Sequence, residues 1–142
     1  MTEDERRAIV IDCERLIRPS HILNEAQDWP APAPLYTENA RFARPSQPGV
    51  FVEGRQAILD SFLARPARAQ RHVIANTVVD ADDVDHARAF SVIVLYQGDP
   101  APEGGLPAMS ANSPLVGTFT DKLERTSEGW RFAERVGGLD FR

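Results

Sequence analysis

The second half of the chain carries long stretches in which apolar and polar residues alternate, and this period of two constrains the fold more than any other feature. It predicts strands at about 71–80, 86–97, 115–126 and 129–139. The last two strands are joined by "SEG", a compact hairpin loop whose glycine can supply a positive φ. Long strands that follow helical patterns in the first half indicate an α+β fold.

The first half opens with a helical pattern. It predicts a helix over 3–18, which begins with a capping-box pattern formed by Thr2 and Glu5. Pro19 is expected to interrupt this helix, and a second short helix is expected over 20–27. The apolar residues that share one face of the first helix are Ile9, Cys13, Leu16 and Ile17.

The middle of the chain is rich in proline. Residues 28–36 contain three prolines in five positions and predict a stiff, extended loop. Short apolar pieces around a proline-rich tip at 40–54 indicate a small hairpin or an irregular edge. A further helix is predicted over 56–65 and is ended by Pro66; its apolar face would hold Ala57, Ile58, Phe62 and Leu63.

Two further features concern the sheet. The strand at 86–97 is apolar on both alternating faces, so we expect it to be central and covered on both sides. The segment 98–114 is rich in Gly and Pro, and its length predicts a mobile loop on the rim of a binding site. Two helices cannot cover a twisted sheet of this size, so a cavity is expected between them and the sheet.

Composition excludes several classes of protein. With 142 residues the chain is expected to form one domain, and its 15 Arg and single Lys are scattered in a protein of net charge −5, which argues against nucleic acid as a partner. One cysteine, Cys13, excludes an internal disulfide and a thiolate metal cluster. No signal-peptide or membrane-span pattern is found, and we expect a cytoplasmic protein. No nucleotide, phosphate or metal motif is present, and a cofactor-free site is expected.

The order of motifs carries a family resemblance. "GRQAILDSFLARP", "RHVIAN" and "GTFTDKLERTSEGWRFAER" follow the first helix in this order, and the set resembles the SnoaL-like branch of the nuclear transport factor 2-like superfamily. This branch includes scytalone dehydratase-like and bile-acid dehydratase-like lyases as well as the small subunits of ring-hydroxylating dioxygenases. The resemblance implies a cone-shaped, curved mixed sheet packed on N-terminal helices around a deep apolar pocket, and usually a homodimer.

His72 is the first candidate site residue. In the dehydratase-like members a histidine after an arginine at the start of this strand is the general base, and the matching pair here is Arg71-His72. An imidazole titrates near neutrality and can both take and return a proton. The alternative is a structural histidine that bonds a backbone carbonyl where the strand begins.

The partners of this histidine match the family less well. The resemblance places the family's tyrosine at Ser20 and its orienting aspartate at Glu25. Glu25 keeps a carboxylate that could hold the imidazole, although it could equally be a solvated helix residue. Ser20 lacks the phenol, for which His21 or Tyr36 are candidate replacements.

Three more polar residues are candidates for the pocket. Asp121 lies among apolar neighbours on one face of its strand, and Arg135 on the adjoining strand could supply the partner charge that a buried Asp needs. A structural pair is the more common outcome of such a pattern. Asn76 alternates with His72 along its strand, and it is therefore expected on the same face.

Two functions from different classes remain open. The first is a cofactor-independent lyase or isomerase of the dehydratase type, which acts on a small hydrophobic ring compound with His72 as base. The second is a non-catalytic small-molecule-binding or assembly module that resembles a dioxygenase small subunit. The partners expected for this chain are a small hydrophobic ligand and a second copy in a homodimer, without nucleic acid or membrane.

Overall fold

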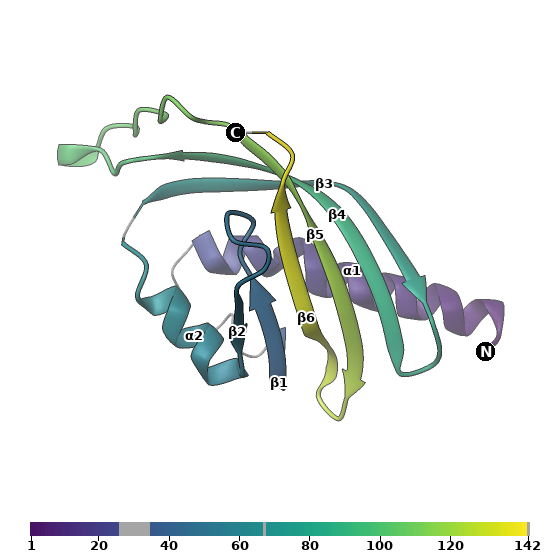
Figure 1. Cartoon of the computed structure of the whole chain (residues 1–142). Coiled ribbons are helices and arrows are strands. Elements are labelled where there is room, and N and C mark those ends of the chain that lie inside the picture. The colour runs from purple at the N-terminus through teal and green to yellow at the C-terminus, as the bar shows by residue number, and fades with distance from the viewer. Residues whose placement is uncertain (26–34, 67, 142) are drawn as a thin grey trace.

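The fold has two layers: a curved sheet, and the helices that cover one of its faces (Figure 1). The computed structural model describes residues 1–25, 35–66 and 68–141, with only the backbone for 22–25. The elements in chain order are α1 (Glu3–Glu25), β1 (Tyr36–Ala43), β2 (Phe51–Glu53), α2 (Arg55–Leu63), β3 (Ala69–Ala81), β4 (His86–Gly98), the short 3-10 helix η2 (Pro102–Gly104), β5 (Leu115–Thr126) and β6 (Gly129–Leu139).

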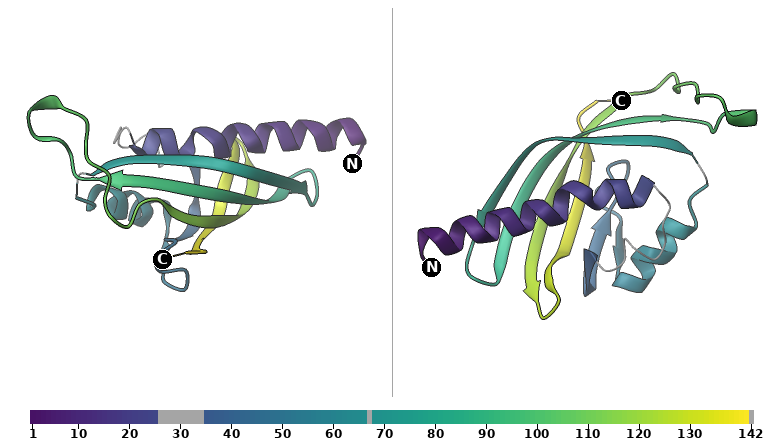
Figure 2. Two further views of the ribbon diagram at one scale, coloured as in Figure 1. Left: turned by 90° about the horizontal axis from the view of Figure 1, so that it is seen from above. Right: turned by 180° about the vertical axis from the view of Figure 1, so that it is seen from behind.

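The six strands form one sheet in the order β2-β1-β6-β5-β4-β3. The β1–β6 pair is parallel and the other neighbouring pairs are antiparallel, so the sheet is mixed, as expected. Helix α1 lies across the sheet and packs mainly on β3, whereas α2 packs on β1 and β2 (Figure 2). The predicted α+β cone is confirmed, and the four long strands match their predicted ranges within two residues.

Helix α1 contributes the predicted apolar face to the core. Its inward residues are fully or almost fully buried: Ile9, Cys13, Leu16 and Ile17. At its start the two capping-box bonds are present, because the Thr2 amide donates to Glu5 Oε2 at 2.6 Å and the Glu5 amide donates to Thr2 Oγ1 at 3.1 Å. Burial raises the pKa of the Cys13 thiol to about 12, which fits an inert core residue.

The predicted break at Pro19 is wrong. One helix runs from Glu3 to Glu25 with Pro19 inside it, although proline removes a backbone donor and disfavours a helix interior. Ile17 and Ser20, on either side of the proline, are both buried against the sheet. Tertiary packing on both sides therefore holds the helix together across a local breaker. The proposed second helix at 20–27 is in part the end of α1, and residues 26–34 lie outside the described residues.

Two irregularities in the strands decide which side chains face the core. In β6 the pairing skips one residue between Leu123–Phe132 and Lys122–Glu134, so Phe132 and Arg135 are both buried although they are three positions apart. In β3 a similar shift between Ile74 and Thr77 breaks the alternation of the strand. Bulges of this kind change the face that a residue occupies, and a strict period of two cannot predict them.

Two predictions about packing need correction. The buried residues of α2 are Ile58, Leu59 and Phe62, whereas Ala57 and Leu63 of the predicted apolar face are exposed. Strand β4 lies inside the sheet, but only one of its faces is covered, since Phe90 on the outer face is 45% exposed. Apolar residues on both faces of β4 therefore do not mean that both faces are covered.

The segment between β4 and β5 does not border the cavity described below. Residues 99–114 contribute nothing to the cavity lining, which includes only the flanking Gln97 and Leu115. The segment folds back on the end of β4, where Gly98 bridges to Met109 and the Ser113 hydroxyl bonds the backbone of Gln97. A side chain at Gly98 would collide with the Ala108 carbonyl, so this close approach requires glycine.

Candidate functional site

A cavity of about 400 Å³ lies between the end of α1, the end of α2 and the sheet. This volume is in the range of small-molecule sites. Its buried lining combines apolar side chains such as Phe42, Phe62 and Phe119 with a few polar ones. The polar members of this buried part are Ser20, His21, Tyr36 and Arg135, and the half-buried His72 joins them.

His72 meets a second histidine inside this cavity. Strand β3 brings His72 to the end of α1, where its ring stacks on that of His21 with centroids 4.4 Å apart and an interplanar angle of 17°. The other side of His21 packs on Phe119 at 5.3 Å. We call His21 and His72 the histidine pair. The sequence predicted His72 as a pocket residue and suggested His21 only as a replacement for the family's phenol. It did not predict that the two rings stack on each other.

The surroundings of His21 favour its neutral form. The residue is only 6% exposed, and neither ring nitrogen has a hydrogen-bond partner among the described residues. Burial, followed by the positive charge of Arg135 and by His72, lowers the pKa of His21 well below its ordinary value. A buried imidazole without hydrogen bonds is costly, because such groups are normally satisfied in protein interiors.

Asp121 and Arg135 form a buried ion pair beside the histidine pair. They are partners in the β5–β6 register, and Arg135 Nε lies 3.1 Å from Asp121 Oδ1 with the two side chains 2% and 0% exposed. The contact lacks hydrogen-bond alignment, so both oxygens of Asp121 remain without a hydrogen-bond partner among the described residues. Burial, opposed by Arg135, raises the pKa of Asp121 to about 6. A pair held in this way contributes little net stability.

Ser20 is tied to this ion pair. Its hydroxyl donates to the Ile17 carbonyl at 2.6 Å and accepts from Arg135 Nη1 at 3.1 Å. The single proton of the hydroxyl is therefore already used within the helix. Ser20 lines the cavity, at the position where the resemblance was expected to place the family's tyrosine, but it does not present a donor to a ligand.

Tyr36 offers a phenol from another element. It is the first residue of β1, is 4% exposed and lines the same cavity. Burial raises the pKa of Tyr36, with the charge of Arg135 acting in the opposite direction. The hydroxyl consequently stays protonated at neutral pH and keeps its capacity to donate.

The described structure does not place two of the predicted site residues, Glu25 and Asn76, beside the histidine pair. Glu25 is the last residue of α1, and its side chain lies outside the described residues. Asn76 is exposed and does not line the cavity, because the bulge between Ile74 and Thr77 breaks the alternation that was expected to join it to His72.

Three arginines in the lining were missed by the sequence analysis. Arg44 follows β1, Arg65 follows α2 and Arg68 precedes β3. Two of them stand in "ARP" tripeptides, at 43–45 and 64–66, where proline ends an element and leaves the preceding arginine at its tip. That repeated tripeptide is the signal that could have singled them out.

Two kinds of feature are absent from the described part of the chain. There, no three His, Cys, Asp or Glu residues come together in a way that could hold a metal ion. Neither of its helices combines the length and the apolar character needed to cross a bilayer.

Comparison with solved structures shows the same fold in several proteins. A candidate scytalone dehydratase from Novosphingobium aromaticivorans superimposes with a TM-score of 0.81 at 17% identity, covering 99% of this chain and 89% of that one. A candidate dehydratase of the NTF2-like family from Streptomyces avermitilis gives 0.78 at 15%, covering 93% and 97%. A ketosteroid isomerase-like protein from Erwinia carotovora atroseptica gives 0.71 at 15%, covering 94% and 97%. Identities this low show a shared fold alone.

Comparison by sequence gives two results. Among curated proteins none matches the chain. The family model of the SnoaL-like domain matches residues 18–136, which includes the end of α1 with Ser20 and His21, the histidine at the start of β3, and the Asp121–Arg135 pair. The chain therefore belongs to the SnoaL-like family of the nuclear transport factor 2-like superfamily.

Proposed function

We propose that this protein is a cofactor-independent lyase or isomerase that acts on a small hydrophobic ring compound, with His72 as the general base. The observation that carries the proposal is the histidine pair in the wall of a largely apolar cavity of about 400 Å³. The solved structures of similar fold include proteins described as dehydratases and as ketosteroid isomerase-like. Shared fold alone does not give function, so the proposal depends on the site.

In the proposed reaction His72 removes a proton from a carbon next to an activating carbonyl. His21 is held neutral, and its stacked ring presents a π face to the imidazolium that forms on His72. Tyr36, with its raised pKa, supplies a neutral hydrogen-bond donor for the carbonyl oxygen. In a dehydration the β-hydroxyl leaves as the double bond forms and takes the proton from His72 to give water. In an isomerisation His72 returns the proton to another carbon as the double bond shifts. Glu25 is the proposed residue that orients the His72 ring.

The proton-abstraction step can be tested without the natural substrate. 2-Tetralone, a bicyclic ketone with acidic α-protons, is incubated with the protein in D2O, and exchange at the α-carbon is followed by proton NMR. The wild-type protein should accelerate exchange, and His72→Ala should reduce the acceleration by roughly a hundredfold or more. His86→Ala is the matched control, since His86 lies in an exposed turn outside the cavity.

The same assay separates the two functions considered from the sequence. Absence of any acceleration, or an acceleration that survives His72→Ala, contradicts the enzyme proposal. Binding of the ketone without exchange would favour the alternative, a non-catalytic binding or assembly module. The involvement of Ser20 in bonds within the protein is the observation in favour of that alternative.

The outer face of the sheet supports the predicted homodimer. It exposes apolar side chains that lie on one face in the β3–β4 register: Val73, Val78, Phe90 and Tyr96. An exposed apolar face of this kind is typical of an interface, and a second copy with the same face gives a closed pair. Sedimentation should show a dimer that Phe90→Asp dissociates; a wild-type monomer at about tens of micromolar would contradict it. The cytoplasmic location stays a prediction.

A further inference from the structure

The charged side chains in the described part of the cavity lining are all of one sign. Among the described residues that line it there are four arginines and no Asp or Glu: Arg44, Arg65, Arg68 and Arg135. The chain as a whole carries a net charge of −5, so this concentration of positive charge is opposite to the overall balance. A cavity with charges of one sign concentrates ligands of the other sign.

One of the four arginines is neutralised inside the protein. Arg135 forms the buried ion pair with Asp121 and donates to Ser20. The other three, which we call the arginine cluster, have no carboxylate partner among the described residues. Arg44 Nη2 lies 3.5 Å from the Ser61 carbonyl, and the Arg65 guanidinium lies over the Phe62 ring at 4.6 Å. The cluster therefore carries uncompensated positive charge into the described part of the lining.

Arg65 is the clearest member. It is partly buried, and its Nε has no hydrogen-bond partner among the described residues although water does not reach that atom. Burial and then the neighbouring charge of Arg44 lower the pKa of Arg65 to about 10, so it remains charged at neutral pH under unfavourable conditions. An anion bound in the cavity would offset both the burial of the Arg65 charge and its repulsion by Arg44.

Arg65 follows α2 and Arg68 precedes β3, three residues apart, and the fold brings Arg44 from the end of β1 to the same cavity lining. Like charges brought together by folding repel one another, and nothing in the described contacts compensates for this. Guanidinium groups bind carboxylates in charge-assisted hydrogen bonds, often through two donors at once.

We propose that the ligand of this cavity is an anionic ring compound, whose carboxylate binds the arginine cluster while its ring lies toward the histidine pair. The inference rests on the proposed function, because it concerns the substrate class of that same site. Arg65 makes the main contact, and the exposed Arg68 contributes less. The neutral, apolar part of the cavity around Phe119 receives the ring.

The test uses two probes of equal shape, 1-naphthoate and 1-naphthamide, which differ in charge. Their affinities are measured by calorimetry at low salt for the wild-type protein and for Arg65→Gln, Arg44→Gln and Arg68→Gln. We expect naphthoate to bind about tenfold or more tightly than naphthamide, and this preference to fall most in Arg65→Gln. Arg88→Gln is the matched control, since Arg88 is an exposed arginine outside the lining and should leave the preference unchanged.

Two results would overturn the inference. The first is equal affinity for the two probes, or a preference that none of the three cluster variants reduces. The second is no binding of either probe at about millimolar concentration, a very weak affinity for a site of this size. Melting temperatures of the four variants check that each is folded. The exchange assay with 2-tetralone uses a neutral ketone and His72→Ala, so a failure of the charge inference can be told apart from a failure of the proposed reaction.

Discussion

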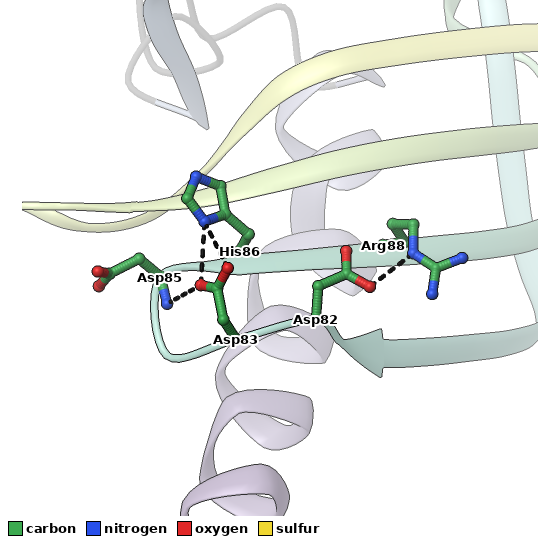
Figure 3. Close-up of polar contacts among 5 residues, drawn as sticks. All are labelled: Asp82, Asp83, Asp85, His86 and Arg88. Atoms are coloured by element: carbon green, nitrogen blue, oxygen red, sulfur yellow. Dashed lines mark hydrogen bonds and ion pairs between the residues drawn. The ribbon is translucent and has the colours of Figure 1, made fainter. Parts of the chain in front are cut away.

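Two regions of this molecule combine histidine, aspartate and arginine in opposite ways. At the β3–β4 turn, Asp82 binds Arg88 at 2.8 Å and Asp83 binds the His86 ring at 3.0 Å, all at the surface (Figure 3). Inside the cone, the Asp121–Arg135 pair and the histidine pair use the same residue types in a largely buried environment, in which His72 alone is half-buried.

The pKa shifts of the two regions have opposite directions. The hydrogen bond and charge of Asp83 raise the pKa of His86, whereas burial lowers that of His21. Solvent screens the turn, and its pairs contribute little to stability. His21 and the Asp121–Arg135 pair are desolvated, and several of their polar atoms are unsatisfied among the described residues. A protein gains no stability from such an arrangement, which is why we assign function to the interior group and only local structure to the turn.

The largest expected difference between the regions is the effect of removing one carboxylate. Asp121→Ala leaves Arg135 charged and buried without its partner, and it should reduce the free energy of unfolding by about 3–5 kcal/mol. Asp82→Ala breaks a shorter ion pair at the surface and should leave stability nearly unchanged. Denaturation with urea measures both. Equal effects of the two substitutions would break the comparison.

A smaller effect is expected at Ser20. Ser20→Ala removes the oxygen that accepts from Arg135 and should lower the free energy of unfolding by about 1–3 kcal/mol, the cost of leaving a buried donor unsatisfied. The same substitution should hardly affect exchange in 2-tetralone, because the hydroxyl is already used within the protein. A large loss of exchange with unchanged stability would instead give Ser20 a direct role in the reaction.

The pH dependence of stability should differ in sign between the two regions. His21 is neutral when buried, but in the unfolded chain it takes up a proton below about pH 6.5. The stability that comes from keeping His21 neutral is therefore fully present above that pH. As the pH falls below it, the free energy of unfolding of the wild-type protein should decrease by up to about 1.4 kcal/mol per pH unit relative to His21→Phe. Comparison with a variant cancels the opposing contribution of Asp121.

The turn supplies the contrast for this measurement. Because the pKa of His86 is raised, its contribution is present below about pH 6.5 and is lost as the pH rises through the folded value. The difference between wild type and His86→Ala should therefore decrease toward alkaline pH. If both variants showed the same pH trend, the two histidines would not occupy the opposed environments described here.

The smallest effect is expected from Asp83→Ala. This substitution should leave the stability almost unchanged and return the pKa of His86 toward its ordinary value, since the hydrogen bond to Asp83 is the main cause of the shift. NMR titration of His86 in this variant measures the change. A pKa that stays raised would assign the shift to the remaining acidic residues, Glu124 and Asp85.

The sheet could be predicted from the sequence, and the site only in part. Strand ranges follow from a period of two, which the chain keeps over long stretches. The continuation of α1 through Pro19 depends on packing on both sides of the proline, which no local pattern contains. Asn76 was misplaced because a bulge changed its face, and Arg65 was missed because its neighbours in the cavity come from distant segments.

The central claim is that folding keeps the buried histidine neutral in the cavity while it favours the charged form at the turn. The most direct measurement is an NMR titration of the ring protons of all three histidines, assigned with His21→Phe, His72→Ala and His86→Ala. We predict that His86 titrates above about pH 6.5 and that His21 stays neutral well below that pH. A titration of His21 at or above pH 6.5 in the folded protein would contradict the account.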